Sequence, residues 1–467
     1  MIKKILIVSA LLFIGMLSFS NVINIPGQYT SIQAGINASA NGDTVLVEPG
    51  VYFENINFRG KRIVLTGRYY INNDPSMIIN TIINGSTPIH PDTASCVIIS
   101  SGEDSTTVLQ GFTLTGGTGT RWNDEHAIGN YYREGGGILI QYSSPVIQNN
   151  IIRNNQAINT SGSVSAGGGG IRMGDSNPKV LNNIIMQNQG IYGPGIVMNY
   201  SGGTFKNNIV CLNSGGQSFN GGGAFWILSN SPAGPRILEN NTIMNNSAAT
   251  GTGGVLCISS TVTISNNIIR GNTSPGNTQV LGGGTVTYCN IQNGFAGTGN
   301  ISSDPLFADS NYILQTGSPC VDAGDSSIVY NDPQDPNNIQ MALYPSRGGL
   351  RNDMGAYGGP LRRILTNGLI GIHNNGSEIP RDFALYQNYP NPFNPSTMIN
   401  FDIVKSGSVK LIVFNVTGKE VSRLIDGYKP AGKYSMDFIA RDLPSGIYFY
   451  TLTSGGYSAT RKMILLK

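Results

Sequence analysis

A pattern of apolar residues and asparagines recurs five times without gaps between residues 146 and 272. In each copy an apolar residue is followed by an asparagine, a second apolar residue and a second asparagine at fixed spacing. The apolar columns are Ile147, Val180, Phe205, Leu238 and Ile264, and then Ile152, Ile185, Val210, Ile243 and Ile269. The asparagine columns are Asn150, Asn183, Asn208, Asn241 and Asn267, and then Asn155, Asn188, Asn213, Asn246 and Asn272.

The copies are separated by 33, 25, 33 and 26 residues. They are rich in β-branched residues and show no heptad or helical pattern, which favours a parallel β-solenoid over an array of helices. The asparagines between the apolar columns are expected to form a tight bend, because Asn tolerates the left-handed backbone. In successive coils, about 4.8 Å apart, their amides should stack into a hydrogen-bonded ladder. We therefore interpret these asparagines as scaffold.

A glycine-rich segment precedes each copy, as in GGGILI (135–140), GGGGIRM (167–173) and GGGAFWI (221–227). Glycines of this kind let the backbone turn sharply and approach the neighbouring coil before the next strand begins. A phosphate-binding loop is disfavoured, because no Lys-Ser/Thr follows and the runs recur as part of the repeat.

These repeats resemble the right-handed parallel β-helix proteins of pectate-lyase-like architecture, and also bacterial surface adhesins built on that fold. Residues 30–67 are similar to the usual entry of exported β-helix proteins, and residues 302–325 and 351–360 to the module that closes them. The resemblance implies an all-β protein with a parallel β-helix over 21–305 and a closing module over 306–360. It says almost nothing about a reaction, because one fold hosts many activities.

The last part of the chain has a different pattern. After an expected linker over 361–380, residues 381–467 alternate apolar and polar positions between turn signals, which predicts a small antiparallel Ig-like β-sandwich. YPNPFNP (389–395) and SGIY (445–448), with the terminal KMILLK, closely resemble the type A C-terminal sorting domain of the type IX secretion system. That resemblance implies the type IX machinery as a partner, export across the outer membrane of a Gram-negative bacterium of the Bacteroidetes or relatives, and removal of the domain on arrival. A carbohydrate-binding sandwich is the alternative.

The N-terminus, residues 1–20, joins two lysines to an apolar run from Ile5 to Leu17. This predicts a secretory signal peptide, because a membrane-spanning helix needs about 20 apolar residues. No later segment is long enough to cross a bilayer. A net charge of +3, with only 12% charged residues, gives no bulk field for nucleic acid. We expect a monomer that is secreted or lies on the outer-membrane surface.

Five cysteines are odd in number and include no CxxC pair, so neither a disulfide framework nor a structural metal site is expected. Three of them, Cys211, Cys257 and Cys289, lie in apolar strand-like runs. We interpret these as stacked core residues rather than catalytic thiols.

The body of the predicted solenoid is poor in carboxylates. Between residues 136 and 300 the only acids are Asp175 and Glu239, against six Lys and Arg residues. Glycoside hydrolysis normally needs two carboxylates, whereas a positive groove favours an anionic glycan. A lightly charged, solvated surface is the alternative.

The longest insertion between repeats, residues 118–135, carries the richest set of candidate side chains. Loops on rigid scaffolds often carry binding function, and aromatic rings beside acids and bases suit contact with sugars. The predicted ligand-binding residues are Trp122, His126, Tyr131, Tyr132 and, from the next repeat, Asp175. The candidate catalytic bases are Arg121, Arg133 and Arg172, and the candidate calcium ligands are Asp124, Glu125 and Glu134. A self-packed surface loop is the alternative.

A second oxygen-rich stretch near the end of the solenoid is a further candidate for a structural calcium ion. Its carboxylates are Asp322, Asp325, Asp332 and Asp335. The spacing does not match an EF-hand, and Asp is also an ordinary turn residue.

Two functions from different classes remain open. The first is a secreted binding or adhesive protein that presents its loops to polysaccharide or a cell-surface glycan, which the scarcity of carboxylates favours. The second is a polysaccharide lyase or related enzyme that acts on an anionic glycan. Placement of Arg172 and Asp175 on the same face as residues 118–135 would favour the enzyme.

Overall fold

The computed structural model describes residues 20–124, 126–160, 162–228, 234–309, 311–363, 372–374, 380, 382–394, 396–405, 407–429, 431–440 and 443–466. The predicted signal peptide up to residue 19, Glu125 and most of the expected linker lie outside the described residues.

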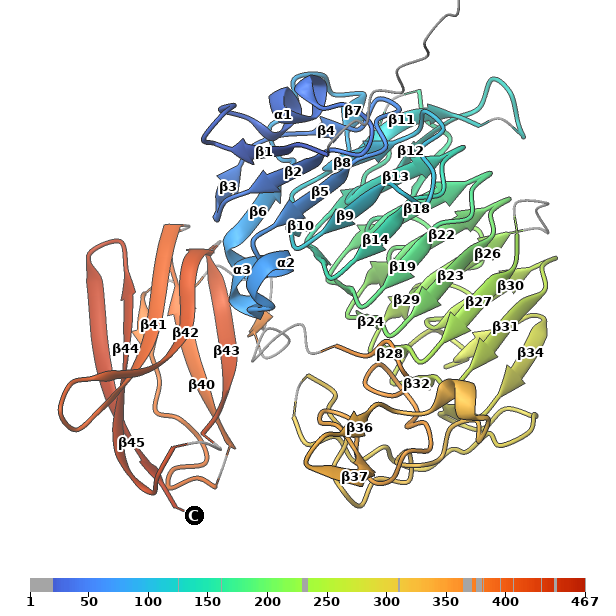
Figure 1. Ribbon diagram of the computed structural model, residues 1–467. Helices are drawn as coiled ribbons and strands as arrows, with labels where there is room; N and C mark the ends of the chain where they lie inside the picture. Colours follow the sequence, from blue (N-terminus) through green and yellow to red (C-terminus); the bar gives the residue numbers. More distant parts are fainter. Residues whose placement is uncertain are drawn as a thin grey trace, which may run out of the picture.

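The first part of the chain winds into stacked coils, which Figure 1 shows running from blue at one end to yellow at the other. Each coil contributes one strand to each of three long parallel sheets with ten, nine and eight strands. The chain is thus a parallel β-helix, as predicted.

The strands follow in spatial order. The ten-stranded sheet contains β1 (Val22–Ile25), β2 (Thr44–Val47), β5 (Val64–Gly67), β9 (Val108–Gln110), β14 (Val146–Gln148), β19 (Lys179–Leu181), β23 (Gly203–Lys206), β27 (Arg236–Glu239), β31 (Val262–Ser265) and β34 (Gly284–Thr287). The nine-stranded sheet contains β3 (Gly50–Tyr52), β6 (Thr81–Asn84), β10 (Thr113–Thr115), β15 (Ile151–Arg153), β20 (Ile184–Met186), β24 (Ile209–Cys211), β28 (Thr242–Met244), β32 (Ile268–Arg270) and β35 (Asn290–Ile291). The eight-stranded sheet contains β33 (Val280–Leu281), β30 (Val255–Ile258), β26 (Phe225–Leu228), β22 (Ile196–Asn199), β18 (Ile171–Gly174), β13 (Ile138–Gln141), β8 (Val97–Ile99) and β4 (Ile56–Asn57).

Shorter elements complete the solenoid. One four-stranded sheet contains β16 (Gln156–Ala157), β21 (Gln189–Gly190), β25 (Ser214–Gly215) and β29 (Ser247–Ala248). Another contains β17 (Ser165–Gly167), β12 (Tyr131–Glu134), β11 (Gly119–Asn123) and β7 (Thr93–Ala94). The helices are α1 (Ile32–Ala38), α2 (Tyr69–Asn72), α3 (Pro75–Asn80) and the 3-10 helix η1 (Ile328–Tyr330), and a last hairpin pairs β36 (Gln334–Asp335) with β37 (Asn338–Ala342).

The interior of the solenoid is built from the apolar columns seen in the sequence. Both columns are buried at 0–1% exposure and belong to one continuous core, together with inward residues of the eight-stranded sheet such as Ile171 and Phe225. Helix α1 covers the first coil with Ile32 and Ile36, and Phe295 packs against the core near the last coils. Burial of aliphatic side chains is the dominant stabilising contribution in such a stack.

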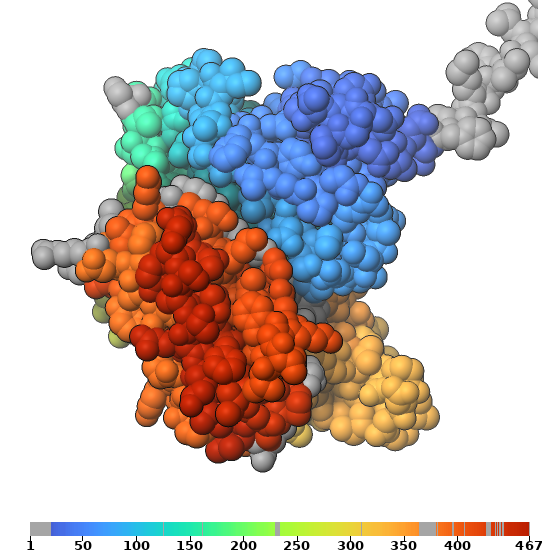
Figure 2. All heavy atoms as spheres, turned by 90° about the vertical axis from the view of Figure 1, so that its left-hand side faces the viewer, coloured from blue at the N-terminus to red at the C-terminus, as the bar shows by residue number. Residues whose placement is uncertain are grey.

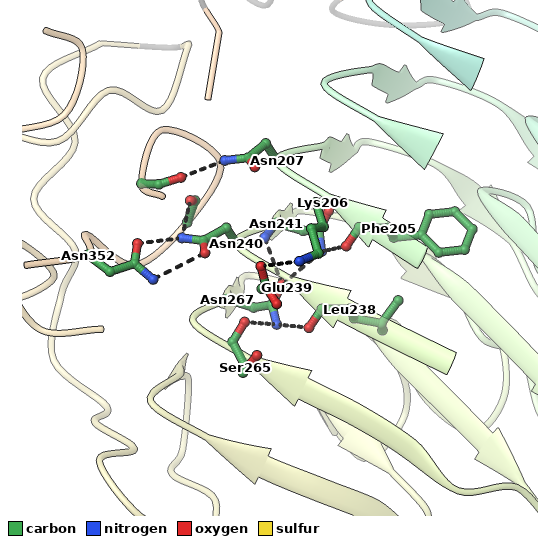
Figure 3. Close-up of polar contacts among 12 residues, drawn as sticks. Phe205, Lys206, Asn207, Leu238, Glu239, Asn240, Asn241, Ser265, Asn267 and Asn352 are labelled. Atoms are coloured by element: carbon green, nitrogen blue, oxygen red, sulfur yellow. Dashed lines mark hydrogen bonds and ion pairs between the residues drawn. The ribbon is translucent and has the colours of Figure 1, made fainter. Parts of the chain in front are cut away.

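The asparagines form two ladders, as predicted. In the first, each side-chain nitrogen from Asn150 to Asn241 donates to the side-chain oxygen of the next asparagine at 3.0–3.2 Å. In the second, the same bonds run from Asn155 to Asn272 at 2.8–3.1 Å and continue to Gln279. Every ladder amide also donates to a backbone carbonyl of the preceding coil, as Figure 3 shows for the bonds from Asn241 to Phe205 and from Asn267 to Leu238. The residue before each ladder asparagine in the first column has a positive φ, from 52° to 59°.

The outer face of the nine-stranded sheet is covered as well, which the repeat pattern did not predict. Its outward residues Ile151, Ile184 and Ile209 form a second apolar cluster with Ile78 of α3 and with residues of the segment 301–359. That segment lies along the side of the solenoid, because Asn207 donates to the Ala356 and Gly358 carbonyls at 3.0 and 2.6 Å. Figure 3 shows Asn240 and Asn352 exchanging side-chain hydrogen bonds at 3.0 and 3.2 Å.

The C-terminal part is a sandwich of two antiparallel four-stranded sheets, drawn in orange and red in Figures 1 and 2. One sheet contains β38 (Ile372–Asn374), β43 (Gly432–Ile439), β40 (Ser396–Ile403) and β39 (Ala384–Leu385). The other contains β42 (Glu420–Lys429), β41 (Gly407–Asn415), β44 (Gly446–Ser454) and β45 (Tyr457–Leu465). Its core alternates with exposed positions along each strand, as in β44, where Tyr448, Tyr450 and Leu452 are buried.

Candidate functional site

Residues 118–135, expected as a loop, form an antiparallel hairpin. Strands β11 and β12 pair with each other from Thr120 opposite Glu134 to Asn123 opposite Tyr131. On one side β11 pairs with β7, and on the other β12 runs parallel to β17. The Arg121 guanidinium lies 3.7 Å over the Tyr131 ring, a cation–π contact. The hairpin is therefore a rigid extension of the solenoid.

Arg133, a candidate base, is committed to holding the hairpin base. Its side chain is 6% exposed, pairs with Asp92 at 2.9 Å, and donates to the Pro91 and Gly119 carbonyls at 2.5 and 2.9 Å. Arg is always charged in proteins, and this one already uses its donors on neighbouring strands. The contacts suit a structural role.

Arg172 and Glu134 form a buried ion pair. Their side chains are 1% and 3% exposed, and Arg172 Nε lies 2.5 Å from a Glu134 carboxylate oxygen. The Tyr192 hydroxyl donates to the other Glu134 oxygen, and the Arg172 guanidinium also donates to the Gln141 side chain. Burial, and then the Glu134 charge, raise the pKa of Tyr192 well above its usual value. A Cβ on Gly174 would lie 2.2 Å from the Gln141 oxygen, so only glycine leaves room for this contact.

At the end of the eight-stranded sheet, three consecutive coils place Tyr142, Asp175 and Tyr200 in one row. The row follows from the pairing of β13 with β18 and of β18 with β22. All three residues have positive φ, at 53°, 42° and 48°, although none is Gly or Asn. Backbone of this kind costs about 1–3 kcal/mol per residue and often clusters at functional sites. Tyr142 is 52% exposed.

His126 carries the hairpin across to this row. Its Nε2 lies 3.1 Å from both Asp175 carboxylate oxygens, and its ring stacks on Tyr200 at 3.7 Å. The Gln141 amide donates to Asp175 at 3.1 Å. The structure therefore brings His126, Arg172, Asp175 and Glu134 to one face of the solenoid. Trp122 and Tyr132 are half-buried on the hairpin itself.

The candidate calcium ligands are not gathered into a site. Among the residues that the structure describes, no group of three or more His, Cys, Asp or Glu side chains could hold a metal ion. Asp124 accepts a bond from the His126 backbone at 2.8 Å, and Glu134 is paired with Arg172. Glu125 is outside the described residues.

The second candidate calcium loop is used for local backbone bonding. Asp325 and Asp335 each accept a bond from the backbone two residues later, at 2.9 and 2.8 Å. Asp322 accepts from Gly349 at 2.8 Å. Asp332 is 3% exposed and faces Asp353, a residue that the sequence did not single out. Burial raises the pKa of both Asp332 and Asp353, and the charge of Asp353 adds to the effect on Asp332.

All five cysteines are buried and free. Cys257 lies in the main core, as predicted, whereas Cys211 lies in the outer cluster. Two others end the ladders: the Asn267 backbone donates to Cys289 Sγ at 3.4 Å, and Cys96 Sγ donates to Asn155 at 3.3 Å. Burial raises the pKa of these thiols to about 12, so they are inert as nucleophiles.

Tyr142, Tyr200, Gln141 and Tyr192 were missed by the sequence reasoning. A signal for the row was present, because continuing the alignment of the glycine-rich segments past the strand places Tyr142, Asp175 and Tyr200 in one column. Tyr192 carried no such signal, because it lies in a turn outside the repeated columns.

The fold defines a parallel β-helix protein that bears a short hairpin on one face and a β-sandwich at its C-terminus. Residues 387–466 match the family of secretion system C-terminal sorting domains. No curated protein and no solved structure is significantly similar to the chain. The sorting domain shows that the protein is exported by type IX secretion and is secreted or lies on the surface of a Gram-negative bacterium of the Bacteroidetes.

Within the described part of the chain, no helix has the length and apolar character needed to span a membrane.

Proposed function

We propose that this protein binds polysaccharide, or a glycan of a cell surface, at the row Tyr142, Asp175 and Tyr200 together with His126. The observation that carries the proposal is the stacking of His126 on Tyr200 and its contact with Asp175, which join a hairpin to a strand end 49 residues away in sequence. Exposed aromatic rings next to a carboxylate offer both a stacking surface and acceptors for sugar hydroxyls.

The rigidity of the site supports a binding role. The row is fixed by parallel pairing in the eight-stranded sheet, and the hairpin is anchored by the Arg172–Glu134 and Arg133–Asp92 pairs. A site that is already ordered loses little conformational entropy when ligand binds. These two arginines thus act in positioning the hairpin.

A polysaccharide lyase is the second candidate, favoured by one observation. Arg172 and Asp175 do lie on the same face as the hairpin, which is the arrangement expected of an enzyme. However, the Arg172 guanidinium is buried and paired with Glu134, so it has no access to a substrate in this arrangement. The binding role is therefore preferred.

The experiment incubates the mature protein with acidic and neutral polysaccharides, with and without calcium, and follows both retention in affinity gels and release of unsaturated or reducing ends. We expect retention by at least one polysaccharide without new ends. Release of unsaturated products would establish the lyase instead.

The variant Tyr142→Ala tests the site. Loss of an exposed aromatic platform should weaken binding about tenfold, or about 1.4 kcal/mol. Tyr70→Ala is the matched control, because Tyr70 is 63% exposed on α2 and remote from the row. Equal binding by the two variants would refute this location.

A further inference from the structure

A shallow groove of about 720 Å³ lies over the short sheet β16–β21–β25–β29, apart from the row on the eight-stranded sheet. Its floor is the column Ala157, Gly190, Gly215 and Ala248, whose members pair in register. The floor is low for a structural reason, since a Cβ on Gly215 would lie 2.0 Å from the Gly190 carbonyl. Its volume falls in the range of about 300–1,000 Å³ that ligand sites occupy.

A second column in the same strands lines the groove with hydrogen-bonding side chains. Gln156, Gln189, Ser214 and Ser247 pair in register on consecutive coils. Each follows a ladder asparagine directly, and because successive strand residues point to opposite faces, an inward Asn leaves the next residue outward. The ladder thereby fixes these groups in a line at the strand spacing, over about 14 Å for three steps of about 4.8 Å.

The side chains of this column are available to a ligand. Within the described part of the chain, Gln156, Gln189, Ser214 and Ser247 make no side-chain hydrogen bonds, nor does Gln217 at the rim. The ladder amides one residue earlier, by contrast, are fully paired. The groove is thus a preorganised row of donors and acceptors, whose ligand would replace water without breaking internal bonds.

The chemistry of the lining selects the ligand. None of the thirteen lining residues is charged, so the groove offers no ion pair to a uronate or sulfate group. Ile158, which is 42% exposed, and Ile191 add apolar contact for the C–H faces of sugar rings. We infer that this groove is a binding site for an uncharged oligosaccharide or a segment of a neutral polysaccharide, distinct from the site at Tyr142.

The test titrates the mature protein by calorimetry with three neutral hexasaccharides, cellohexaose, xylohexaose and mannohexaose, and with the hexamer of galacturonic acid as the charged probe. At least one neutral hexasaccharide should bind, and the double variant Gln156→Ala/Gln189→Ala should weaken it tenfold or more. Ser214→Trp, which fills the groove, should abolish binding. Gln340→Ala is the matched control, because Gln340 is exposed and lies on β37, outside the groove.

Thermal unfolding of each variant checks that the solenoid is intact, and His126→Ala separates the two sites. Loss of neutral-sugar binding in the groove variants but not in His126→Ala supports the inference. Loss in His126→Ala alone would leave the site at Tyr142 standing and overturn the groove. Binding of no neutral hexasaccharide at millimolar concentration, or binding of the charged hexamer as tightly as any neutral one, would also overturn it.

Discussion

Substitution of Asn208 by alanine should break the first asparagine ladder at its centre. The Asn208 side chain is fully buried, and its nitrogen donates to the Val180 carbonyl at 2.8 Å and to Asn241 at 3.0 Å. Its oxygen accepts from the Asn183 backbone at 2.9 Å and from the Asn183 amide at 3.1 Å. Alanine removes all of these bonds and leaves buried partners on both adjacent coils.

The magnitude follows from the bonds lost. Each buried hydrogen bond contributes about 1 kcal/mol net, and an abandoned buried partner costs about 1–3 kcal/mol. Two donated and two accepted bonds therefore give a loss of about 4 kcal/mol in the free energy of unfolding. Because a solenoid is stabilised by contacts between neighbouring coils, the loss should be concentrated near the coils on either side.

Urea denaturation measures the total loss, and hydrogen exchange locates it along the solenoid. Asn337→Ala is the control, because Asn337 is exposed and its side chain lies outside the ladders. We expect the control to change stability by less than about 0.5 kcal/mol. A loss below about 1 kcal/mol for Asn208→Ala, or one equal to the control, would refute the claim that the ladder holds the coils together.

Three further predictions concern other parts of the chain. The pKa values of Asp332 and Asp353, raised to about 8 and about 7, lie above the ordinary 3.8. Their contribution to stability is therefore complete below that ordinary value and lost as the pH rises to about 8. Hydrogen exchange over 306–359, corrected for the intrinsic rate, should be faster at pH 9 than at pH 5, and Asp332→Asn should weaken this dependence. Arg172→Met should destabilise the solenoid by about 3–5 kcal/mol in urea, because it leaves Glu134 buried without its partner, and adding Glu134→Leu should recover much of the loss; an equal loss in both variants would contradict the pairing. Deletion of residues 387–466 should abolish delivery to the cell surface or medium, as cell fractionation would show, whereas unchanged delivery would contradict the role of the sorting domain.

The sequence also defined the asparagine ladders and the inward apolar columns, because both arise from a short pattern repeated in register. A residue such as Ile152 or Asn183 meets its own equivalent in the next coil, so local periodicity already specifies the contact. The same pattern contained a second signal that went unused. The paired isoleucines of each copy, such as Ile151 and Ile152, show that both faces of the nine-stranded sheet are buried.

Only the tertiary structure decided the candidate site. Whether Arg172 faces Glu134 or solvent depends on how a hairpin outside the repeat leans over the coils, and no periodicity describes that hairpin. The contact of His126 with Asp175 joins segments from different elements in the same way. Repetition thus determined the scaffold from the sequence alone, whereas the insertions, each occurring once, acquired their partners through three-dimensional packing.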